Sequence, residues 1–133
     1  MHKLSRKEGM EILNSYLELG LPKLKWYQQI KSHIKAIVFY GSTAKGLNRI
    51  DSDLDILIFV PLKIEKEYTK GEYLYKYHNR EINIVLRSME RLRKLGREQN
   101  SFFESEVFRK SKILSESDSE VKTLIKKIRA VKN

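Results

Sequence analysis

The chain of 133 residues contains no cysteine, and this absence excludes disulfide bonds, thiolate zinc sites and cysteine nucleophiles. It also has no apolar run that approaches the length of a membrane span, and its N-terminus lacks the apolar core of a signal peptide. We therefore expect a cytoplasmic protein with no membrane contact.

Acidic residues are scarce relative to basic ones, since 17 Asp and Glu stand against 27 Lys and Arg and give a formal net charge of +10. Such a surface attracts polyanions, whether nucleic acid, nucleotide or an acidic partner. A Lys-rich proteome, such as that of a thermophile, accounts for the charge equally well. The length and the ordinary hydrophobic fraction of 41% predict one globular domain that spans 1–133.

The most informative stretch begins at Gly41-Ser42, directly after an apolar run over 34–40 that predicts a strand. Glycine allows a tight turn there and leaves peptide N–H groups free to face an anion. Ten residues separate Ser42 from Asp53, which opens a second apolar run together with Asp55. Residues two apart in a strand share a face, so these two carboxylates project together and need a cation between them. Hard oxygen ligands suit Mg²⁺.

This stretch resembles the signature of the polymerase-β-type nucleotidyltransferase superfamily, in which a Gly-Ser turn precedes an Asp-Xaa-Asp motif. The likeness is greatest to the minimal, antitoxin-like branch, because Ser52-Asp53-Leu54-Asp55 fits its Ser-Asp-Xaa-Asp pattern. It is sharp over 34–60 and looser over 81–115. The resemblance implies an α/β fold, with a small mixed β-sheet that carries the active site on one face and helices packed on the other.

The resemblance also implies an enzyme that transfers a nucleoside monophosphate from a nucleoside triphosphate, with ATP the expected donor, to an acceptor hydroxyl. It assigns six residues to this site: Asp53 and Asp55 to Mg²⁺, and Gly41, Ser42, Lys45 and Arg49 to the triphosphate. Two solvated charges on a basic protein are the alternative for Lys45 and Arg49. A chain this short has little room for an acceptor domain, so a homo-oligomer or a helical partner protein would complete the site. In the resembled branch that partner is a toxin.

The family pattern includes a third acid on a later strand, and here Ile82-Asn83-Ile84-Val85 places asparagine at that position. Glu81 shares the strand face of Asn83 and is the alternative catalytic group. Loss of the third acid weakens activation of the attacking hydroxyl more than nucleotide binding. The alternative function is therefore a binding module with the same fold and little or no turnover, acting as an antitoxin or binding RNA.

Hydrophobic periodicity and turn residues predict the remaining elements. A capping box at Ser5–Glu8 should open a helix that ends at Gly20. The other predicted elements are a helix over 22–32, a short helix over 43–48, a loop with a helical turn over 62–71, a hairpin over 72–87, a helix from Ser88 to about Gln99, a helix over 100–110, a short strand at Ile113–Leu114 and a helix that follows a second capping box at Ser117–Glu120.

Two groups of side chains allow a packing or a ligand-binding interpretation. Trp26 and Tyr27, and the alternating tyrosines of 72–77, suit either a hydrophobic core or an exposed stacking surface, and we favour the core. The last helix has an apolar side and a basic side with Lys122, Lys126, Lys127 and Arg129. Such a helix binds nucleic acid, membrane or a partner, or packs on the sheet with a solvated back, which is the favoured interpretation.

Overall fold

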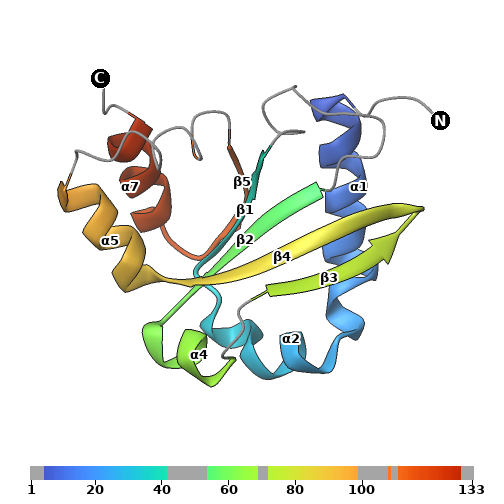
Figure 1. Cartoon of the computed structure of the whole chain (residues 1–133), viewed down its shortest axis with the longest axis horizontal. Helices are drawn as coiled ribbons and strands as arrows, with labels where there is room; N and C mark the ends of the chain where they lie inside the picture. Colours follow the sequence, from blue (N-terminus) through green and yellow to red (C-terminus); the bar gives the residue numbers. More distant parts are fainter. Residues whose placement is uncertain (1–4, 42–53, 69–71, 99–107, 109–110, 130–133) are drawn as a thin grey trace.

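A five-stranded mixed sheet organises the computed structural model, which describes residues 5–41, 54–68, 72–98, 108 and 111–129 (Figure 1). The strand order is β3-β4-β2-β1-β5. The strands are β1 (Ala36–Tyr40), β2 (Leu54–Val60), β3 (Glu72–Tyr77), β4 (Arg80–Ser88) and β5 (Lys112–Glu116). β2 and β4 are parallel neighbours, and every other pair in the sheet is antiparallel.

Both faces of the central strands are apolar, because each strand carries buried side chains at odd and even positions. The first face contributes Ile37, Phe39, Leu54, Ile56, Ile58, Val60, Ile82, Ile84 and Leu86 to one hydrophobic cluster. The second face contributes Ala36, Val38, Leu57, Phe59 and Val85 to another. A sheet that is apolar on both faces must be covered on both.

The first face is covered by the N-terminal helices α1 (Arg6–Leu19) and α2 (Lys25–Ile30), with the short 3-10 turns η1 (Leu21–Lys23) and η2 (Lys31–His33) beside them. The predicted capping box opens α1: Ser5 Oγ accepts from the Glu8 amide, and Glu8 Oε1 accepts from the Ser5 amide, both at 3.0 Å. The helix ends before Gly20, as predicted.

The second face is covered by α5 (Met89–Glu98) and α7 (Glu120–Arg129), which lie on the opposite side of the sheet from α1 (Figure 1). Leu92, Val121, Ile125 and Ile128 are the buried contacts of these helices. The predicted α/β class and mixed sheet are confirmed. Helices cover both faces, however, and not one face alone, so the face that carries Asp55 also carries α5 and α7. No helix in the described ranges is long and apolar enough to cross a membrane.

The predicted hairpin is confirmed as β3 and β4, joined through His78 and Asn79. These two residues have φ of 51° and 61°, the left-handed pair that suits a two-residue turn between twisted strands. The segment after β2 is more regular than predicted, because α4 (Leu62–Glu67) replaces most of the expected loop.

The helix predicted after residue 117 begins at Glu120, and the second capping box does not form. Asp118 Oδ1 accepts from the Glu120 amide at 2.9 Å, while Ser117 Oγ donates to the Lys35 carbonyl at 3.4 Å. The Glu120 carboxylate is bound by Arg93 and so does not cap its own helix. The predicted helices over 43–48 and over most of 100–110 lie outside the described residues.

The aromatic side chains of α2 and β3 belong to the core, as favoured from the sequence. Trp26 stacks on Tyr73 with ring centroids 4.6 Å apart and donates its Nε1 hydrogen to the Tyr75 hydroxyl at 2.7 Å. The Tyr77 hydroxyl lies 2.6 Å from Ser15 Oγ. All of these rings pack against the first-face cluster, and this packing accounts for the alternating tyrosines.

Candidate functional site

The site starts where β1 ends, at Gly41. Antiparallel pairing places Tyr40 opposite Asp55, so the next residue lies beside the Asp55 carboxylate. Gly41 has φ of 86°, which side-chain-bearing L residues rarely adopt. A β-carbon at this position would overlap Asp55 Oδ2 and lie 3.1 Å from Asp55 Cγ. Glycine is therefore required here by both the backbone and the neighbouring carboxylate.

Asn83 is the second neighbour of Asp55, because the parallel register of β2 and β4 pairs these two residues directly. Asn83 Nδ2 donates to Asp55 Oδ1 at 3.4 Å, a long hydrogen bond between two half-buried side chains. The amide is neutral and carries both a donor and an acceptor, so it can hold the carboxylate without repelling it. The register thus brings Asn83 next to Asp55, the second carboxylate of the Asp-Xaa-Asp motif.

Glu81 lies earlier in β4 than Asn83 and nearer to the hairpin turn. It is exposed, pairs across the hairpin with Lys76, and precedes Asn83 by two residues, a separation of about 7 Å. Alternation along the strand directs both side chains to the same face. The structure therefore groups four of the predicted site residues: Gly41, Asp55, Asn83 and, at the periphery, Glu81. The other four, Ser42, Lys45, Arg49 and Asp53, lie outside the described residues.

The chemistry of this group fits a hard divalent cation. Asp55 offers carboxylate oxygens. The Asn83 amide also offers an oxygen, since its hydrogen bond to Asp55 uses the amide nitrogen. Across the described residues, no three His, Cys, Asp or Glu side chains cluster in a way that could hold a metal ion. The predicted metal site therefore depends on Asp53 joining Asp55.

A cleft of about 710 Å³ adjoins the group on the second face. Leu57 and Val85 line it, and they follow Asp55 and Asn83 by two residues on their strands. Tyr40, opposite Asp55, and the basic side chains Arg87, Arg91 and Lys94 also line it. Neither Tyr40 nor Arg87 was predicted from the sequence to be a site residue. Strand alternation was the available signal, because Asn83, Val85 and Arg87 share a face.

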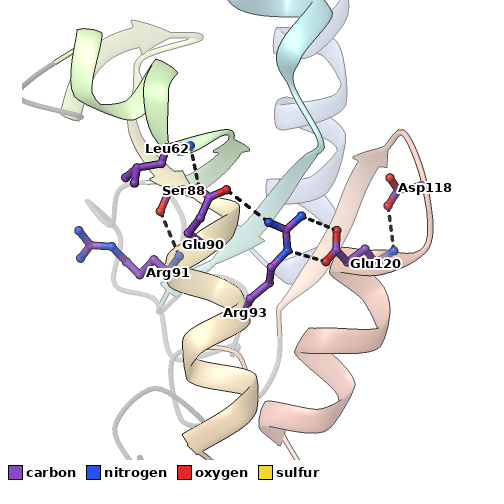
Figure 2. Close-up of polar contacts among 7 residues, drawn as sticks. All are labelled: Leu62, Ser88, Glu90, Arg91, Arg93, Asp118 and Glu120. Carbon is purple, nitrogen blue, oxygen red and sulfur yellow. Dashed lines mark hydrogen bonds and ion pairs between the residues drawn. The ribbon is translucent and has the colours of Figure 1, made fainter.

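Helix α5 forms one wall of this cleft and is fixed at its first turn. Ser88 Oγ accepts from the Arg91 amide at 3.0 Å and caps the helix, and Ser88 itself is buried. Glu90 Oε2 accepts from the Leu62 amide at 2.8 Å, which ties α5 to the first residue of α4 (Figure 2).

Arg93 links the same turn to α7 (Figure 2). Its Nε and one terminal nitrogen donate to the two Glu120 oxygens at 2.7 and 3.0 Å, and its other terminal nitrogen donates to Glu90 at 3.3 Å. The hydrogen bonds from Arg93 lower the pKa of Glu120, and the same bonds raise the pKa of Arg93. A bidentate pair of this kind holds α5 against α7 in one orientation.

Comparison with known proteins gives one family and one fold. The nucleotidyltransferase domain family matches residues 21–129. A nucleotidyltransferase-like protein from Exiguobacterium sibiricum 255-15 has a similar structure, with a TM-score of 0.53 and 13% sequence identity. The alignment covers 88% of this chain and 40% of that one, so the chain spans less than half of its structural neighbour. At this identity the likeness concerns the fold alone. No curated protein matches the chain.

Proposed function

Because the chain belongs to the nucleotidyltransferase domain family, we propose that it transfers a nucleoside monophosphate from a nucleoside triphosphate to an acceptor hydroxyl. The observation that supports this most directly is the juxtaposition of Gly41, Asp55 and Asn83 across β1, β2 and β4. A left-handed glycine turn against an aspartate on a central strand is the arrangement expected of a phosphate-holding turn beside a metal-binding carboxylate. Phosphoryl and nucleotidyl transfer require that combination.

In this proposal Asp53 and Asp55 hold Mg²⁺, which when bound neutralises the triphosphate charge and aligns the reacting oxygens. Gly41 and Ser42 hold the outer phosphates through the backbone and the Ser42 hydroxyl, and Lys45 and Arg49 add positive charge. Asn83 orients the Asp55 carboxylate through the hydrogen bond between their side chains. ATP is the donor that we propose.

Removal of the acceptor proton needs a base, and the Asn83 amide cannot act as one. Glu81 carries an exposed carboxylate on the same strand face, about 7 Å away. We assign the base to Glu81. Turnover should be slower than with an acid at position 83, since an exposed group two residues away is less well placed than a direct neighbour of Asp55.

The acceptor in this proposal is a hydroxyl on a helical partner protein, and the chain acts as the antitoxin of that partner. The likeness to the minimal branch supports this, and the cleft beside Asp55 provides space for the side chain that carries the hydroxyl. A homo-oligomer is the other way to complete the site. A small all-helical protein encoded by the adjacent gene would favour the first arrangement.

A second candidate function is a binding module that kept the fold and lost turnover, acting as an antitoxin or binding RNA. Asn83 favours it, because the residue that neighbours Asp55 cannot take up a proton. Gly41 and Asp55 favour the enzyme, since a left-handed glycine turn beside a carboxylate suits a nucleotide site and is not needed to bind a partner by surface alone.

Transfer is tested with ATP labelled on its α-phosphate, incubated with Mg²⁺, the purified protein, and either the product of the adjacent gene or total RNA. The wild type should label one acceptor, and Asp53→Asn with Asp55→Asn should abolish labelling. Mg²⁺ with ATP should also raise the melting temperature of the wild type and not of the double variant, by mass action on the folded state. A melting shift without labelling of any acceptor would select the binding module; the absence of both would contradict the nucleotide site itself.

A further inference from the structure

A second cleft, of about 730 Å³, lies away from the Asp55 group, along the last strand of the sheet. All five residues of β5 line it, together with Lys122, Lys126 and Arg129 of α7 and Arg6 of α1. β5 and α7 are consecutive elements joined by a short loop (Figure 1). The cleft therefore runs along β5, and α7 forms one of its walls.

β5 is an edge strand. One side of it pairs with β1, from Phe39 opposite Lys112 to Ala36 opposite Glu116. In the described ranges no strand pairs with its other side. An edge strand presents peptide N–H and C=O groups along its length, and these groups bind an extended peptide. The pairing with β1 shifts register at Leu114, because Ser115 lies opposite Ile37 and Ile113 lies opposite Val38.

The charges that line the cleft are mostly positive: Arg6, Lys112, Lys122, Lys126 and Arg129, against the single carboxylate of Glu116. The three lysines are exposed, and none forms an ion pair with another described residue. Such a lining attracts an anionic ligand and repels a cationic one.

The Arg129 side chain of this positive surface is held in place by hydrogen bonds. Its Nε donates to the Phe108 carbonyl at 2.7 Å, and one terminal nitrogen donates to the Ser111 carbonyl and to Ser111 Oγ. Burial lowers the pKa of Arg129, and the like charge of Arg6 lowers it further. An anion between the two guanidinium groups would relieve this repulsion.

Two features distinguish among possible anions. No described aromatic residue lines the cleft, so unpaired bases of a nucleic acid would find no stacking platform. Glu116 lies at one end of the strand, where it would repel a uniformly charged phosphate backbone, whereas a peptide can place a neutral or basic residue there. A second copy of this chain would oppose Lys122 and Lys126 with equally basic surfaces. The mixed lining therefore suits a peptide with a patterned negative charge.

We propose that this cleft is a docking site for an extended acidic segment of a partner protein, which lies along β5 with carboxylates toward Lys122 and Lys126. The site goes beyond nucleotidyl transfer, because docking needs none of the residues around Asp55. It would hold a partner protein whether or not that partner is also the acceptor.

Docking is tested with a fluorescein-labelled ten-residue peptide in which Glu alternates with Val or Thr, read by anisotropy at low salt. Lys122→Glu with Lys126→Glu should weaken binding by at least about tenfold, since a cationic wall becomes anionic. Lys63→Glu with Lys66→Glu on α4 is the matched control, because both lysines are exposed, lie outside the cleft, and give the same change in net charge. Their melting temperatures verify that both variants fold.

Amide exchange locates the peptide. Binding should slow exchange in β5 and leave β3, the opposite edge of the sheet, unchanged. The proposal would be overturned if the peptide bound equally to the Lys122/Lys126 and Lys63/Lys66 variants, or bound to neither. An RNA hairpin that bound more tightly than the peptide, and that needed Lys122 and Lys126, would also overturn it and would indicate a nucleic-acid site. A dimer that the Lys122/Lys126 variant dissociated would indicate a second copy of the chain instead. None of these results depends on nucleotide transfer.

Discussion

Gly41 and Asp55 are fitted to each other: a β-carbon on Gly41 would overlap the Asp55 carboxylate, and the glycine has φ of 86°. The two residues are 14 positions apart in the sequence, yet the antiparallel pairing of β1 and β2 makes them neighbours. The turn and the carboxylate therefore form one structural unit. A change at either residue should be felt at the other.

Gly41→Ala should lower the free energy of unfolding by about 1–2 kcal/mol from the backbone alone, because an L residue at this φ is strained. It should also displace Asp55 and remove the melting shift caused by Mg²⁺ with ATP. Urea denaturation and thermal shift measure the two effects. In Gly41→Ala with Asp55→Ala the overlap is relieved, so the double variant should be more stable than the sum of the single effects predicts. Strict additivity would show that the two residues do not interact.

Asn83→Asp should raise nucleotide transfer by up to about 100-fold, because it supplies a base next to Asp55. Without metal, the same change should lower the melting temperature, since the new carboxylate would lie within hydrogen-bonding distance of Asp55 Oδ1. Mg²⁺ should restore the loss. Both readouts are measured on one preparation, by labelled transfer and by thermal shift with and without Mg²⁺.

Glu81→Gln tests the assignment of Glu81 as the base. If Glu81 is the base, this change should reduce transfer strongly while leaving the melting shift with Mg²⁺ and ATP intact, because Glu81 is exposed and is not next to Asp55. Lys76→Gln, opposite Glu81 in the hairpin, is the matched control for the loss of a surface charge. Unchanged transfer in Glu81→Gln would remove Glu81 from the reaction.

Features that depend on near neighbours in the sequence were predictable. The Ser5–Glu8 capping box and the hairpin at His78-Asn79 use residues within a few positions of one another, and both form. The presence of helices on both faces of the sheet could also have been predicted. Leu54–Val60 is an almost continuous apolar run, which is typical of a strand buried on both faces.

Features that depend on distant partners were not predictable from local sequence patterns. The direct pairing of Asp55 with Asn83 joins positions 28 apart and follows from the order of the strands, and only the family resemblance placed the two residues in one site. The second capping box failed for the same reason, since Arg93, 27 positions away, takes the Glu120 carboxylate. A bidentate guanidinium is a stronger partner than a single backbone amide. Local pattern reasoning has no access to such competition.

The Arg93–Glu120 pair should couple by about 1 kcal/mol in a double-mutant cycle, at the upper end for exposed pairs because it is bidentate. Its folded-state carboxylate has a lowered pKa, so its contribution should be present above the ordinary glutamate pKa and should disappear as the pH falls through the lowered value. Urea midpoints of the wild type and Glu120→Gln should differ at neutral pH and converge as the pH falls below the lowered pKa of Glu120.

The Arg91–Glu65 pair is the control for this cycle. It has one contact at 3.3 Å, and the Arg91 side chain is 58% exposed, against 39% for Arg93. Its coupling should therefore be smaller, about 0.3 kcal/mol. Equal coupling in the two cycles would mean that the bidentate geometry adds nothing to stability.

Tyr16→Phe should leave stability unchanged or raise it by about 1 kcal/mol, because the buried Tyr16 hydroxyl has no hydrogen-bond partner in the described part of the chain. Burial, and next the charge of Tyr75, raise the pKa of Tyr16 to about 12. A raised pKa means that the hydroxyl ionises less readily in the folded state, so stability is unaffected by this group below about pH 10 and is lost as the pH rises from there toward 12. The phenylalanine variant should lose less stability over that range.

Tyr75→Phe is the contrasting variant for this prediction. The Tyr75 hydroxyl accepts from Trp26 Nε1 at 2.7 Å, and its removal leaves the indole N–H without that partner. The cost should be about 1–2 kcal/mol, although the two substitutions delete the same atom. Urea denaturation at neutral pH compares them directly, and a titration toward pH 12 tests the alkaline loss. If Tyr16→Phe destabilised the protein as much as Tyr75→Phe, the Tyr16 hydroxyl would have to form a hydrogen bond in solution. The inference that it is buried without a hydrogen-bond partner would then be wrong.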